Sequence, residues 1–165
     1  MDNFFESASA KLEEMETVLN SAAARLQGFP ARLRAVSAQV KRNISVRDAD
    51  LEGDFNATAK ELYDFASASE EFWAATRETV RGYSKKDLAE NHAFEIKSFN
   101  VKARMLTRSI EDVASRFAEI LRAANGAGLK LNLWMLEAAS LNLDKLAGKI
   151  LFMSRSLSKI LEAEK

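Results

Sequence analysis

Residues 129–161 decide the fold, because they carry more apolar side chains than one face of a helix can hold. They read LKLNLWMLEAASLNLDKLAGKILFMSRSLSKIL. Wound at about 100° per residue, the stretch forms an apolar face well wider than the ~100° stripe of an ordinary surface helix. The face comprises Leu129, Leu133, Leu136, Leu143, Ala147, Ile150, Leu157 and Leu161, and it is extended sideways by Leu131, Met135, Ala139, Leu146, Met153 and Ile160. A helix this apolar needs neighbours on several sides, which predicts a helical bundle.

A third line of large apolar residues runs along the same stretch, among charged residues. Trp134, Leu141 and Phe152 follow one another at spacings of 7 and 11 residues, which keeps them on one side of a helix. Aromatic residues are enriched where proteins meet. These three residues are therefore our candidates for binding a protein partner or a second copy of the chain. Burial in a wide bundle core is the other interpretation, and it is the one that the wide apolar face of this stretch favours.

The N-terminal part repeats apolar residues at alternating steps of three and four, which is the heptad spacing of packed helices. This seam begins at Phe5 and continues to Val40. It crosses Gly28 and Pro30 without losing phase. Proline removes a helical hydrogen bond, and glycine followed by proline favours a helix stop and restart. We expect either a kink in one long helix or two helices that meet at Pro30.

Two more long helices are predicted after this one. Residues 48–54, DADLEGD, predict a non-helical break. A helix then carries its seam from Phe55 to Tyr83. The next runs from about Lys85 to Asn125, with Ser84 as its cap. A turn at residues 126–128, Gly-Ala-Gly, separates it from the last helix. The chain is therefore predicted to be all-α: one domain of residues 1–165, an elongated antiparallel bundle of four long helices with coiled-coil-like packing.

Composition narrows the function classes. The 165 residues include 24 basic and 24 acidic side chains and no cysteine. Because the charges balance, the chain as a whole has no net electrostatic attraction to nucleic acid or anionic lipid. Without cysteine it has no disulfide and no thiolate chemistry. The acidic N-terminus does not resemble a signal peptide, and the apolar runs fall far short of the ~20 residues that cross a bilayer. A cytoplasmic, soluble protein is the simplest interpretation.

Catalytic motifs are absent from the sequence. His92 is the single histidine, which excludes a metal site built from two histidines. The sequence has no glycine-rich phosphate loop and no Gly-x-Ser-x-Gly. We therefore expect no enzyme activity, no cofactor and no metal. His92 itself lies in the seam of the 85–125 helix, and we interpret it as a packed core residue. The alternatives are a pH-responsive polar position that fixes register and a haem ligand, which a helix running straight through His92 disfavours.

Two charge patterns remain. Residues 32–47 carry only basic charges, and residues 48–71 carry eight acidic side chains against Lys60 alone. Because these blocks are adjacent in the chain, we expect them to neutralise each other. The alternative is contact with an anionic surface through Arg32, Arg34, Lys41 and Arg42. On the third helix, a line of basic residues interrupted by glutamates predicts a solvated face; it comprises Lys86, Lys97, Arg104, Arg108 and Arg122.

These patterns predict a non-enzymatic helical-bundle interaction protein that acts through apolar contacts between helices. Adaptor, assembly factor, chaperone and structural subunit are the classes that fit. The alternative is a bundle that acts on membrane or lipid surfaces, by peripheral binding or pore formation. Nucleic-acid binding is disfavoured by the balanced charge, and no small-molecule substrate is indicated.

Overall fold

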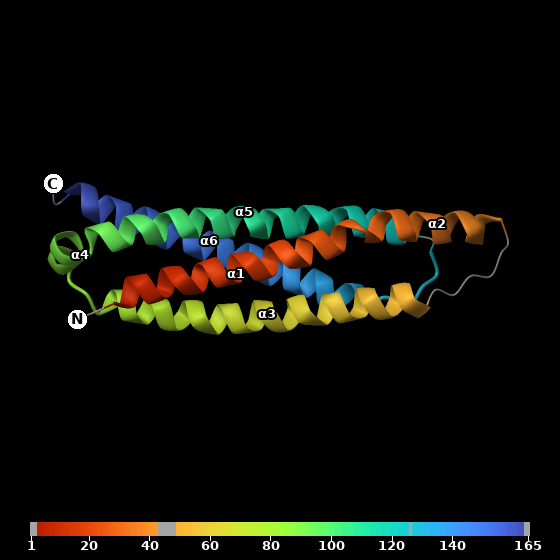
Figure 1. The fold of residues 1–165 in the computed structure, drawn as a ribbon, viewed down its shortest axis with the longest axis horizontal. Coiled ribbons are helices and arrows are strands. Elements are labelled where there is room, and N and C mark those ends of the chain that lie inside the picture. The colour runs from red at the N-terminus through yellow and green to blue at the C-terminus, as the bar shows by residue number, and fades with distance from the viewer. Residues whose placement is uncertain (1–2, 43–48, 126, 164–165) are drawn as a thin grey trace.

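The computed structural model describes residues 3–42, 49–125 and 127–163, which form six α-helices (Figure 1). No residue of these ranges is in a strand. The helices are α1 (Phe4–Gln27), α2 (Phe29–Lys41), α3 (Ala49–Arg81), α4 (Lys85–Asn91), α5 (Ala93–Ala124) and α6 (Leu133–Ala163). The all-α prediction is confirmed.

The long helices lie side by side, and the short α4 crosses one end of the molecule (Figure 1). Their direction alternates along the chain, but α1 packs mainly against α5, and α3 mainly against α6. Both of these pairs are parallel (Figure 1). For α1 and α5, Phe5 packs on Phe99 near the start of both helices, with ring centroids 6.0 Å apart, and further along both helices the hydroxyl of Ser109 donates to Asn20 Oδ1 at 2.8 Å. The antiparallel arrangement predicted from sequence holds for α5 with α6 but not for these pairs. The reason is that α4 carries the chain across the end of the molecule, so that α5 lies beside α1 rather than beside α3.

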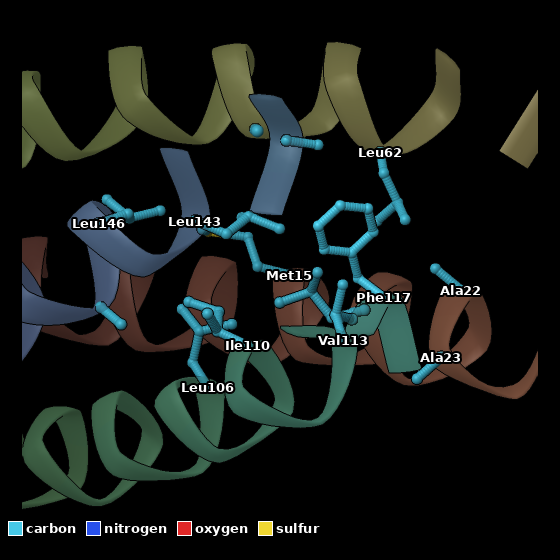
Figure 2. Close-up of a cluster of buried hydrophobic side chains, with 14 of the residues drawn as sticks. Met15, Ala22, Ala23, Leu62, Leu106, Ile110, Val113, Phe117, Leu143 and Leu146 are labelled. Atoms are coloured by element: carbon cyan, nitrogen blue, oxygen red, sulfur yellow. The ribbon is translucent and has the colours of Figure 1, made fainter. Parts of the chain in front are cut away.

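The buried core is built from the seam positions of every long helix. Figure 2 shows Met15 of α1, Ile110 and Val113 of α5, and Leu143 of α6 converging in the middle of the molecule. Each large apolar side chain that is fully buried contributes about 1.5–3 kcal/mol. Because the seams are used for packing, a functional surface has to come from other faces of the helices.

The junction of α1 and α2 combines the two predicted alternatives. Gly28 interrupts the helix for one residue, yet its backbone stays right-handed helical, with φ −78° and ψ −19°. The N–H of Gly28 donates to Arg25 O at 3.4 Å, while Pro30 has no N–H to donate. Phe29 and Leu33 are buried, as Leu26 is before them. The seam therefore continues through the break.

The predicted break at residues 48–54 is wrong for residues 49–54, which form the first turns of α3. Leu51 is fully buried, and its burial favours helix over the turn that the aspartates and Gly53 suggest. Asp50 and Glu52 also lie in the first turn, where the helix dipole stabilises negative charge. Asp48 lies outside the described residues.

The helix predicted over residues 85–125 is broken at His92, whose backbone has φ −128° and ψ 10°. Ser84 caps α4 as expected, because its Oγ accepts a hydrogen bond from the N–H of Asp87 at 3.0 Å. The break lets α4 fold over the end of the core, where Leu88 is buried. The His92 ring is also buried and packs on Phe5 and Tyr83, with ring centroids 5.6 and 5.0 Å apart. Burial of these side chains outweighs an uninterrupted helix.

The last helix begins at Leu133 rather than at Leu129. Gly128 has φ +69°, a left-handed conformation that glycine adopts readily. The chain before Leu133 is held by α3: the N–H of Asn132 donates to Asn56 Oδ1 at 2.7 Å, and Asn56 Nδ2 donates to Lys130 O at 3.2 Å. These bonds satisfy backbone groups that a helix would otherwise pair internally. Gly126 of the predicted turn lies outside the described residues.

Candidate functional site

The three residues predicted to bind a partner lie on the outer face of α6. Trp134, Leu141 and Phe152 are 61%, 55% and 74% exposed, so their burial in a wide core, the interpretation favoured from the sequence, is wrong. The Trp134 ring meets Tyr63 of α3 edge-on, with centroids 5.8 Å apart. The line spans 18 residues, or ~27 Å of helix.

A groove between α3 and α6 lies beside the exposed ring of Phe152. Its volume is about 360 Å³, and Trp73, Val80 and Met153 line it together with Phe152. Trp73 is buried, but its Nε1–H has no hydrogen-bond acceptor in the described part of the chain. A buried N–H without an acceptor costs about 1–3 kcal/mol. Arg77, Arg81 and Lys149 also line the groove, so it combines an apolar surface with positive charge.

Among the described residues, the predicted pairing of the basic and acidic blocks is realised by Arg32 of the basic block. Arg32 lies 3.3 Å from Asp54 Oδ2, and its guanidinium lies over the ring of Phe29. A stronger pair forms outside the block, where Arg25 donates to both oxygens of Glu61 at 2.7 and 2.8 Å. These hydrogen bonds lower the pKa of the Glu61 carboxyl below its ordinary value and raise the pKa of Arg25. The charge pattern of the sequence did not predict the pair of Arg25 and Glu61, because Arg25 precedes the basic block.

The other predicted anionic-surface residues are separated from the acidic helix. Arg34 and Lys41 line a hollow of about 430 Å³ between α2 and α5, together with Arg122. Within the described ranges, none of these three side chains has a carboxylate within ion-pair distance. Arg42 is exposed at the end of α2, and Arg47 lies outside the described residues.

Two surface features were missed by the sequence analysis. The first is an exposed apolar line on α5, made of Phe94, Val101 and Met105. Its signal in the sequence is a spacing of 7 and 4 residues that is out of phase with the buried seam. The second is a groove between α5 and α6, in which Lys97 and Arg104 of the predicted solvated face meet basic residues of α6. Sequence alone could not place those two helices together.

In residues 3–42, 49–125 and 127–163, no three histidine or acidic side chains gather closely enough to hold a metal ion. None of the helices in these ranges combines the length and apolarity needed to span a membrane. Comparison of the chain with known protein families, curated proteins and solved structures gives no match.

Proposed function

We propose that this chain is a non-enzymatic interaction protein that self-associates through the outer face of α6. The observation that carries the proposal is the exposure of Trp134, Leu141 and Phe152 on one line of a helix whose opposite face is buried. Covering apolar surface contributes about 25 cal/mol for each Å² removed from water. Single exposed apolar residues are ordinary, but a line of large ones is typical of a contact surface.

The line is self-complementary, which is why a second copy is the proposed occupant. If two α6 helices pair antiparallel about residue 143, Trp134 of each copy lies opposite Phe152 of the other. Leu141 then lies opposite Lys145, whose aliphatic stem can cover it. Each contact occurs twice, as a two-fold interface requires. The groove beside Phe152 would receive part of the incoming indole ring.

The finer architecture belongs to the same proposal. Each copy would be a single-domain bundle of four long helices, with α1 and α2 counted as one and with coiled-coil-like seams. Within the class of interaction proteins, a structural or assembly subunit fits self-association best. A cytoplasmic location rests on the absence of cysteine from the sequence.

A lipid-surface function is the second candidate. It is favoured by the hollow lined by Arg34, Lys41 and Arg122, whose cations have no carboxylate partner in the described structure. Co-sedimentation with anionic vesicles at low salt tests it. Binding that is lost in R34Q/K41Q would support this candidate, whereas no binding at low salt would exclude it.

The self-association proposal is tested by light scattering over a concentration series. We expect the mass of the wild-type chain to rise above the monomer value of 18.4 kDa, and W134A/F152A to remain monomeric. F94A/M105A is the matched control, because it removes exposed apolar side chains from α5 instead, and it should associate as the wild type does. Thermal unfolding followed by circular dichroism checks that the variants are folded. A wild-type monomer at every concentration, or association unchanged in W134A/F152A, would contradict the proposal.

A further inference from the structure

The groove between α5 and α6 concentrates positive charge near the C-terminal end of α6. Its volume is about 700 Å³, within the range of small-molecule sites. Lys97 and Arg104 of α5 line it, with Arg155 and Lys159 of α6; among the described residues, Glu162 is the one acidic side chain in its lining. None of the four cations has a carboxylate within ion-pair distance among the described residues.

The two arginines lie on opposite walls of the groove. Since α5 and α6 are antiparallel and Asn100 contacts Ser158 across them at 3.0 Å, Arg104 lies opposite Ser154 and Arg155. By the same register, Lys97 lies opposite Leu161 and Glu162. The arginine end of the groove therefore has two cations facing each other without an acid, and the lysine end has a partly compensated charge. An anion between the arginines would relieve their repulsion.

The floor of the groove has unused hydrogen-bonding capacity. Asn100 is 5% exposed, and its Nδ2 donates to Ser158 Oγ. Its Oδ1 is buried without a donor in the described part of the chain. Because the Ser158 hydroxyl can donate as well as accept, rotation of the amide by 180° would pair Oδ1 with Ser158 and leave the NH₂ group, a donor, without a partner instead. In either orientation Asn100 keeps one amide atom without a protein partner in the lining of the basic groove.

We propose that this groove binds a multiply phosphorylated molecule, with one phosphate held between Arg104 and Arg155 and a second toward Lys97 and Lys159. Guanidinium groups form paired hydrogen bonds with phosphate, and lysine acts as a point charge. Lys97 and Arg104 are separated by ~10 Å along α5, so a ligand with a single anionic group would reach one end only. The exposed side chain of Val101 lies in the lining and offers an apolar contact to the body of the ligand.

Isothermal titration calorimetry with inositol hexakisphosphate tests the site. We expect one molecule to bind per chain at low salt. R104Q/R155Q should weaken binding by about 10- to 100-fold, because it removes two charge-assisted contacts. R34Q/R122Q removes two arginines from the hollow between α2 and α5, and it should leave the affinity within about twofold. Circular dichroism melts of both variants show that the fold is intact.

The phosphate groups could belong to a soluble molecule or to a lipid headgroup, and a second arm of the experiment separates these sources. Phosphatidylcholine vesicles with and without a phosphatidylinositol bisphosphate are co-sedimented with the protein. Binding to the phosphorylated vesicles, displaced by inositol hexakisphosphate, assigns the lipid source, whereas binding of the soluble probe alone assigns a soluble ligand. The absence of binding in both arms, an equal loss in the two variants, or full binding by R104Q/R155Q would overturn the proposal. The outcome does not depend on self-association, because R104Q/R155Q leaves Trp134 and Phe152 in place.

Discussion

Leu141 and Leu143 are two residues apart on α6, and they illustrate how its two faces differ. Leu143 is 1% exposed and lies in the core with Ile110 and Val113 (Figure 2), whereas Leu141 is 55% exposed. Both are leucines in the same turn of the same helix. The comparison teaches that the apolar residues of α6 divide between two environments: one face supplies folding free energy, and the other leaves in water the apolar surface that we propose a second copy covers.

The largest expected effect follows from the same substitution at the two positions. L143A should lower the free energy of unfolding by about 2–5 kcal/mol, because it leaves a cavity in the core. L141A should change it by less than about 0.5 kcal/mol, since the side chain is more than half exposed. Urea unfolding of both variants measures the difference. Equal losses at the two positions would mean that the outer face is also packed in the monomer.

A second prediction concerns the segment just before α6, which Asn56 of α3 holds in place through Lys130 and Asn132. N56A should destabilise the chain by about 1–3 kcal/mol, because it removes the bonds to Lys130 and Asn132 and leaves two backbone groups to be satisfied otherwise. Urea unfolding measures the loss, and hydrogen exchange at the Asn132 amide should accelerate. N142A is the matched control on α6, and it should be nearly neutral. If the two variants were equally stable, Asn56 would not be holding the start of α6.

The smallest effect is expected for the ion pair between Arg25 and Glu61, because it is exposed to solvent as the outer face of α6 is. Arg25 lowers the pKa of Glu61 from its ordinary value of 4.5. The resulting stability is fully present above that value and is lost as the pH falls through the lowered pKa of the folded state. Both side chains are more than one third exposed, so E61Q should cost only about 0.2–1 kcal/mol at neutral pH. Unfolding measured across pH should show the wild type and E61Q converging in acid; a gap that persisted there would contradict this origin.

The sequence was sufficient for local features with a periodic signal. Steps of three and four predicted the buried positions of α1, including Phe5 and Leu19, and the continuation through Pro30. Spacings of 7 and 11 placed Trp134, Leu141 and Phe152 on one line, although the exposure of that line came from the structure, since burial was favoured from the sequence. These predictions succeeded because a helix fixes the direction of each side chain relative to the last.

The remaining features depend on which helices meet, and periodicity does not specify that. The break at His92 follows from covering Phe5, which lies 87 positions earlier in the chain. The start of α6 at Leu133 depends on Asn56, which lies on another helix. The basic groove needs α5 and α6 side by side. Each of these features is decided by burial or hydrogen bonding between distant segments, which outweighs local helix preference.

The parallel pairing of α1 with α5 has a consequence for how the chain is made. Asn20 and Ser109, which join these helices, are 89 residues apart in the sequence. At a synthesis rate of about 5–20 residues per second, α1 leaves the ribosome ~5–20 s before its main partner exists. Throughout that interval its apolar face is without α5. A bundle whose neighbours were consecutive in sequence would close each pair as it emerged and would fold faster. Nascent chains of this protein therefore depend on α5, which begins past the midpoint of the sequence, to bury the apolar face of α1.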